Sequence, residues 1–280
     1  MGHRHPVPAG VILCGNPPVV HPMRHRSFSP TYLIGLLLPL TLITCKPGDP
    51  VPPEPELIGT VRVVVRPTWE GLPFHLNEVY HNVSDYRVKV EALKFYLGDV
   101  RFVDDGYFAT AKEVSYFDLQ HDGDTVVWNN VPTGTWTSLR MGLGVPQVLN
   151  DADPIVYPPG HPLSLAWGTY WTWATAYRFV MFDGRYDLDG AGTGAVQQPF
   201  SMHTGVNVCY REFDLPLATP LVVNGTSTAT VVLDLAVDRF FHSDGEVLDL
   251  ATENQTHGND PAHVLALKLT NNVINAFSAQ

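Results

Sequence analysis

Short apolar runs of strand length recur along most of the chain, separated by turn residues. The runs cover residues 61–65, 86–97, 100–103, 115–119, 125–128, 135–143, 177–182, 213–217 and 228–237. Dipeptides such as Asp122-Gly123 and Asn224-Gly225 lie between them and favour tight hairpins. Val88 and Val90 alternate with polar residues, which is typical of a strand with one buried face. The pattern predicts a mainly β domain, an antiparallel β-sandwich or barrel.

Two segments depart from this strand pattern. Residues 146–173 form a long excursion rich in proline that ends in aromatic residues, and long loops in compact domains are often functional. Residues 261–277 carry apolar side chains largely at helical spacing, with Asp260 as a candidate N-cap and Pro261 at the first helical position. We therefore expect a long Pro/aromatic-rich loop and a short C-terminal helix.

The N-terminal part of the chain is typical of an export signal. Residues 32–44 are uncharged and mostly apolar, follow two arginines, and are too few to span a bilayer. Residues 1–44 are therefore interpreted as a signal peptide. Met23 would start a signal of ordinary length, so residues 1–22 are interpreted as a mis-assigned start and play no part in the fold.

A lipid anchor is expected directly after this signal. Leu42-Ile43-Thr44-Cys45 resembles a bacterial lipobox, in which the cysteine is lipidated and becomes the mature N-terminus. Residues 46–56 contain five prolines, which favour an extended tether. The expected organisation is lipidated Cys45, a tether over 45–56 and one domain over 57–280. We expect a lipoprotein of the cell envelope, periplasm-facing or at the surface, held by its lipid in the outer membrane.

Charge and missing motifs exclude several function classes. All 28 acidic residues but only 14 of the 17 basic ones lie from Cys45 onward, so the mature chain carries a formal charge of −14. No basic run is present, so nucleic acid is not an expected partner. The chain has no GxSxG, P-loop, GxGxxG or HExxH motif, so no hydrolase, kinase, dinucleotide or zinc-enzyme chemistry is supported. We expect a protein that is not an enzyme.

The strongest candidate chemistry is a soft metal site near the aromatic residues of the long loop. Phe200-Ser201-Met202-His203-Thr204-Gly205 follows that loop. Monovalent copper favours thioether and imidazole ligands, so Met202 and His203 are candidate ligands in an exported protein. The alternative is that the aromatic residues belong to the core and that His203 is an ordinary surface or turn residue.

The order of several short motifs along the chain resembles the MbnP-like copper-binding proteins, a family of exported bacterial proteins. The matching pieces are Leu76-Asn77, Phe95-Tyr96-Leu97-Gly98-Asp99-Val100, Val131-Pro132-Thr133-Gly134, Leu143-Gly144-Val145-Pro146, Tyr170-Trp171-Thr172-Trp173, Tyr177-Arg178-Phe179, Met202-His203-Thr204-Gly205 and residues 272–277. The resemblance implies a β-rich copper-binding domain and, as partner, a di-haem cytochrome c peroxidase-like protein encoded nearby.

The resemblance also implies the ligands. In some relatives a tryptophan is oxidised to kynurenine and holds copper together with two histidines. Trp171 and Trp173 match the tryptophan block of the family, and His203 matches its histidine block. Pro67 lies where many relatives carry a histidine. We therefore expect His75 as the second ligand.

Three alternatives stay open at this stage. His161, at the entrance of the aromatic loop, is the next candidate for the second ligand. A glycan-binding or adhesive surface module would use Trp167, Trp171 and Trp173 as sugar-stacking faces. An accessory lipoprotein that only docks another protein is the third alternative.

Overall fold

A computed structural model describes residues 57–280 except 122, 173–175 and 259–260. These residues belong to one compact unit. The expected signal peptide, the expected lipidation site Cys45, the whole tether over 45–56 and Trp173 lie outside the described residues. No helix in the described part of the chain is long and apolar enough to cross a membrane.

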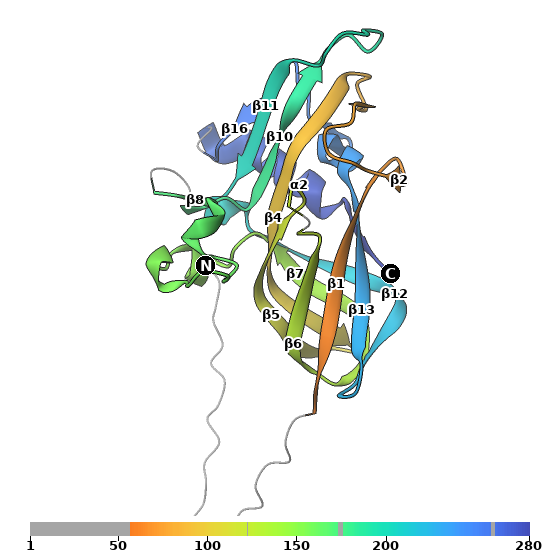
Figure 1. The fold of residues 1–280 in the computed structure, drawn as a ribbon, viewed down its shortest axis with the longest axis vertical. Coiled ribbons are helices and arrows are strands. Elements are labelled where there is room, and N and C mark those ends of the chain that lie inside the picture. The colour runs from red at the N-terminus through yellow and green to blue at the C-terminus, as the bar shows by residue number, and fades with distance from the viewer. Residues whose placement is uncertain (1–56, 122, 173–175, 259–260) are drawn as a thin grey trace, which may run out of the picture. The chain divides into compact units, whose positions relative to one another are not determined.

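Most strands join one large mixed sheet (Figure 1). The strands are β1 (Ile58–Trp69), β2 (Leu72–Pro73), β3 (Tyr80–His81), β4 (Arg87–Asp104), β5 (Tyr107–Asp118), β6 (Thr125–Pro132), β7 (Gly134–Leu143), β8 (Tyr170–Trp171), β9 (Ala176–Tyr177), β10 (Val180–Asp187), β11 (Gln198–Thr204), β12 (Arg211–Val223), β13 (Thr228–Ala236), β14 (His242–Ser243), β15 (Glu246–Val247), β16 (Gln255–Thr256) and β17 (Phe277–Ala279). The helices are α1 (Gln147–Asn150) and α2 (Val264–Ile274), with short 3-10 turns at η1 (Pro154–Val156), η2 (Leu165–Trp167), η3 (Asn207–Cys209), η4 (Val237–Phe241) and η5 (Pro261–His263).

A barrel body forms the larger part of this sheet. Its hydrogen-bonded path runs β5-β4-β7-β12-β17-β13-β1-β6, and the two ends of the path meet where Asp118 and Gly123 pair in the turn between β5 and β6. Side chains alternate along these strands, so that Val61, Val63 and Val65 of β1 are each at most 1% exposed. Burial of such apolar surface is the main force that stabilises the body.

A second part of the sheet extends from the first half of β4. β10 pairs antiparallel with that half of β4 and with β11, and the two-residue β16 pairs in parallel with β11. We call β10, β11 and β16 the edge strands. They lie together at one end of the molecule in Figure 1, beside β8.

The long excursion after β7 packs as a small layer of its own. Its core contains the buried side chains of Leu163, Tyr177 and Phe179, which lie against Tyr96 of β4. The buried amide of Asn150 accepts a hydrogen bond from the Tyr177 backbone N–H at 3.0 Å and so fixes the entrance of the excursion to its exit.

The predicted mainly β architecture with a short C-terminal helix is confirmed, with two differences. The sheet is mixed, because β1 runs parallel to β13. The C-terminal helix starts at Val264, because Ala262 and His263 have left-handed backbone angles of φ 55° and 53° that a continuous α-helix does not accept. Asp260, the expected N-cap, lies outside the described residues.

Candidate metal centre

Two imidazoles and one indole converge beside the edge strands. The ring centroids of His203 and His257 are 5.3 Å apart. The Trp171 ring lies 5.2 Å from that of His203 and 5.3 Å from that of His257, edge to face in both cases. The three rings therefore form a compact triangle.

The register of the edge strands brings the two histidines together. Met202 of β11 is paired with Thr256, the last residue of β16, in a parallel ladder. The residues that follow them, His203 on β11 and His257 just after β16, therefore lie side by side. Trp171 reaches the same place from β8, where it pairs with Ala176 of β9. Three segments far apart in the sequence supply one site.

The two faces of β11 carry different chemistry. Phe200 and Met202 point into the main hydrophobic core, where Met202 is fully buried. Ser201 and His203 point to the opposite face, as alternation along a strand requires. The structure therefore places the predicted ligand Met202 in the core and His203 at the ring triangle.

Asp183 of β10 fixes the imidazole of His203. Nε2 of His203 lies 2.9 Å and 3.0 Å from the two carboxylate oxygens, and the Ser201 hydroxyl donates to the same carboxylate at 2.7 Å. Burial opposes ionisation of Asp183, but the hydrogen bond and charge of His203, with Ser201 and Arg178, hold the pKa of Asp183 below its usual value. A carboxylate accepts hydrogen bonds, so Nε2 carries the proton.

In the neutral imidazole that has its proton on Nε2, the lone pair of His203 lies on the other nitrogen, Nδ1. Nδ1 is buried and has no hydrogen-bond partner among the described residues. The few other buried side-chain atoms without a hydrogen-bond partner among the described residues belong to amide, hydroxyl and indole groups, which are weaker metal ligands than imidazole. A buried acceptor without a partner costs free energy unless something binds it.

His257 supplies a second imidazole. Its pKa is lowered, first by burial and then by the charges of His203 and Arg178, which outweigh the opposite effect of Asp183. A neutral imidazole is the form that coordinates a metal ion. The short distance between the two rings and the lowered pKa of His257 both suit metal binding.

Arg178 covers the indole of Trp171. Its guanidinium carbon lies 4.4 Å from the centre of the indole ring system, within the range of a cation–π contact. The same guanidinium donates to the backbone carbonyls of Gly168 and Thr169. Burial lowers the pKa of Arg178. The stack holds Trp171 in a fixed position next to the histidines.

The described residues supply too few ligands for a fully coordinated metal site. Among the residues that the structure describes, no group of three or more His, Cys, Asp and Glu side chains is arranged to hold a metal ion. The indole nitrogen of Trp171 carries a proton and donates only, so it is not a ligand as encoded. The pair of imidazoles would need a third donor from another source.

The other predicted ligands lie apart from this triangle. His75 is exposed between β2 and β3, and its backbone N–H donates to the Tyr80 hydroxyl at 2.8 Å. His161 stacks on Tyr157 with 4.6 Å between ring centroids. Neither histidine contacts His203 in the described part of the chain, and Trp173 lies outside it.

Sequence reasoning missed His257, Asp183 and Arg178. His257 follows a strand of only two residues, which leaves no periodic signal, and its spacing to other histidines matches no ligand motif. Asp183 is in an Asp-Gly dipeptide, which predicts a turn, whereas the structure places it inside β10. The Tyr177-Arg178-Phe179 motif was noted, but nothing in it indicates a cation over an indole.

The family comparison agrees with the motif order. The family model described as MbnP matches residues 58–259. Among solved structures, MbnP from Methylosinus trichosporium is similar to this chain at 16% sequence identity and a TM-score of 0.47, with 75% of this chain and 87% of that chain covered. No curated protein matches the chain. The family model spans most of the domain and includes all three rings of the triangle, and the chain belongs to the MbnP family.

Proposed function

We propose that this protein binds a single copper ion between His203 and His257 and works in copper handling in the cell envelope, without catalytic turnover of its own. The observation that carries the proposal is the buried Nδ1 of His203, which has no hydrogen-bond partner in the described part of the chain and lies beside the imidazole of His257. Asp183 accepts a hydrogen bond from Nε2 of His203 and so orients the ring. Histidines that bind a metal through one ring nitrogen usually donate a hydrogen bond from the other in this way.

The shortage of ligands favours copper over zinc. Structural zinc sites take four protein ligands, and catalytic zinc sites take three and a water. The described residues offer two imidazoles here and no cluster with a third His, Cys, Asp or Glu. Imidazole suits copper, and His203 and His257 supply two such donors.

A ring-opened Trp171 would supply the third donor. Oxidation of tryptophan to kynurenine cleaves the C2–C3 bond of the indole and adds one oxygen atom to each carbon. Hydrolysis of the resulting formyl group then releases formate and leaves an aniline-type amine with a lone pair. Trp171 already contacts both histidines, so a donor made from its side chain would face the copper ligands. The oxidant would be hydrogen peroxide, two molecules per indole, reduced to water by the di-haem cytochrome c peroxidase-like partner that the family resemblance implies. Mass mapping of the peptide that contains Trp171 after co-production with that partner tests this step, and an intact indole with full copper occupancy would contradict it.

The surroundings of Trp171 support a metal site more than a sugar-binding face. Arg178 lies over its ring, and the two imidazoles approach it edge to face. A sugar would have to displace Arg178 in order to stack on that face. The export signal and the lipidated Cys45 complete the proposal, since they would place the copper site in the envelope.

Copper titration of three histidine variants tests the proposed site. His203→Ala and His257→Ala should each weaken copper binding by about 100-fold or more, because loss of a ligand should cost at least as much as loss of its orienting partner. His75→Ala is the matched control and should bind like the wild type. Thermal unfolding of the metal-free variants checks that the fold is kept.

The outcomes separate the candidate ligand sets. Full copper binding by both His203→Ala and His257→Ala would contradict the proposed site. Loss of binding in His203→Ala and His75→Ala, with full binding by His257→Ala, would favour the ligand pair expected from the sequence.

A further inference from the structure

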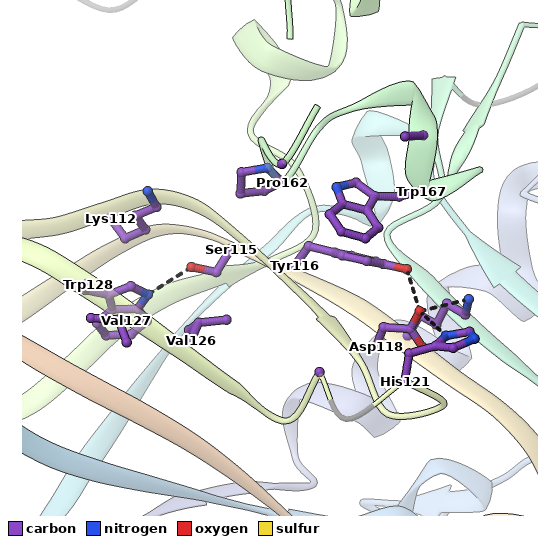
Figure 2. Close-up of a pocket in the computed structure, with 14 residues that line it drawn as sticks. Lys112, Ser115, Tyr116, Asp118, His121, Val126, Val127, Trp128, Pro162 and Trp167 are labelled. Atoms are coloured by element: carbon purple, nitrogen blue, oxygen red, sulfur yellow. Dashed lines mark hydrogen bonds and ion pairs between the residues drawn. The ribbon is translucent and has the colours of Figure 1, made fainter. Parts of the chain in front are cut away.

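A groove on the barrel body, away from the histidines, has the features of a second binding site. It lies where β5 and β6 diverge from their turn, and the segment 160–167 of the long excursion forms its upper wall (Figure 2). Its volume is about 610 Å³. This size is within the range of small-molecule pockets.

The middle of the groove is apolar and aromatic. The rings of Tyr116 and Trp167 are tilted against each other with centroids 5.5 Å apart. Trp167 is 43% exposed, and Val127 in the facing wall is 50% exposed. The Trp167 N–H donates to the His161 carbonyl at 2.8 Å, which fixes the indole in place. Exposed apolar side chains gathered around one hollow indicate an apolar ligand more than a solvated surface.

The charges of the groove are unequal at its two ends. At one end Asp118 is paired with Lys94 at 3.1 Å and with His121 at 3.0 Å. At the other end Lys112 forms no ion pair within the described residues. Figure 2 shows Lys112 and Asp118 on opposite sides of Tyr116. One uncompensated ammonium therefore borders the aromatic section, in a protein whose overall charge is negative.

We propose that this groove binds a small organic anion with a flat apolar body, such as an aromatic carboxylate. The apolar body would lie against Trp167 and Val127, and the anionic group would accept hydrogen bonds from Lys112. The inference does not depend on copper, because none of the three rings of the metal centre lines the groove.

Calorimetric titration of the metal-free protein with two matched probes tests the proposal. Naphthoate carries the anion, and naphthylmethanol has the same ring system without the charge. The wild type should bind naphthoate at least about tenfold more tightly, since hydrogen bonds to charged groups exceed neutral ones. Lys112→Gln should remove this preference and leave naphthylmethanol binding unchanged. Lys89→Gln, at a pair with Glu91 outside the groove, is the control.

Two further variants test the aromatic wall. Trp167→Ala should weaken both probes by about tenfold, through loss of the stacking surface. Ala166→Glu places a carboxylate in the same wall and should weaken naphthoate binding more than naphthylmethanol binding. This variant tests the wall independently if Trp167→Ala alters the conformation of the loop. Equal binding of the two probes to the wild type, or an unchanged preference in Lys112→Gln, would overturn the proposal.

Discussion

The barrel body buries almost only apolar side chains, whereas the edge strands bury both apolar and polar ones. In the barrel body the buried positions are mostly apolar, as in Val61, Val63 and Val65 of β1. At the edge strands, His203 is only 6% exposed although it is polar. Burial of apolar surface stabilises a fold, whereas burial of polar groups costs free energy unless they are hydrogen-bonded. The comparison indicates that both regions contribute to the apolar core, and that the edge strands also bury the polar groups on which the proposed function rests.

Removal of a large ring from the barrel body should have the largest effect on stability. Phe102 is fully buried between Trp128 and Trp136. Phe102→Ala should lower the free energy of unfolding by about 3–5 kcal/mol, because it removes apolar contacts and leaves a cavity. Urea unfolding measures this change.

The control for that variant is a phenylalanine outside the core. Phe108 is 45% exposed, and Phe108→Ala should cost below about 1 kcal/mol. Copper affinity of folded Phe102→Ala should equal that of the wild type. A large loss of copper affinity would show that the barrel body and the edge strands are coupled, and would contradict their independence.

Loss of the carboxylate behind His203 should have an intermediate effect, on copper and not on the fold. Asp183→Asn keeps the shape of the side chain but weakens its hold on Nε2 of His203. We expect copper affinity to fall by about 10–100-fold, with little change in urea unfolding of the metal-free protein. Asp214→Asn, which alters an exposed pair with Arg140 on the barrel body, should leave copper affinity unchanged. If both variants weaken copper equally, Asp183 acts through net charge alone.

The smallest effect should be the contribution of Asp118 to the pH dependence of the free energy of unfolding. Asp118 lies at the rim of the barrel body. Burial opposes ionisation of Asp118, but hydrogen bonds from His121, Lys94 and the Gln120 backbone hold its pKa below the usual value. Since the folded pKa is lower than the unfolded one, this contribution is complete above the unfolded value of about 3.9 and is lost as the pH falls through the folded pKa.

Asp118→Asn tests this contribution. The variant should be less stable than the wild type at neutral pH, and the difference should shrink as the pH falls below about 4. Urea unfolding of the two proteins at several pH values measures it, since other carboxylates titrate in both and cancel. A difference that is constant with pH would indicate that the carboxylate contributes only through its shape.

Much of the fold could be predicted from local patterns in the sequence. The apolar runs at 61–65 and 228–237 lie within or overlap β1 and β13, and the helical spacing near the C-terminus corresponds to α2. These signals are local, because a buried face needs apolar residues at a fixed period. His203 could be singled out from its neighbours in the sequence, but its role as a ligand stays a prediction.

The amino-acid sequence alone is enough to predict the class of fold, several of the turns and one histidine worth testing. Which residues lie beside His203 is known only from the tertiary structure. His257 is brought to it by a parallel pairing of β11 with a strand of two residues, and Trp171 by a turn of the long excursion. Residues that are paired across two parallel strands need not be close in sequence, so no rule of sequence spacing predicts such a pair. The lowered pKa of His257 depends on burial and on nearby charges, which exist only once the chain has folded.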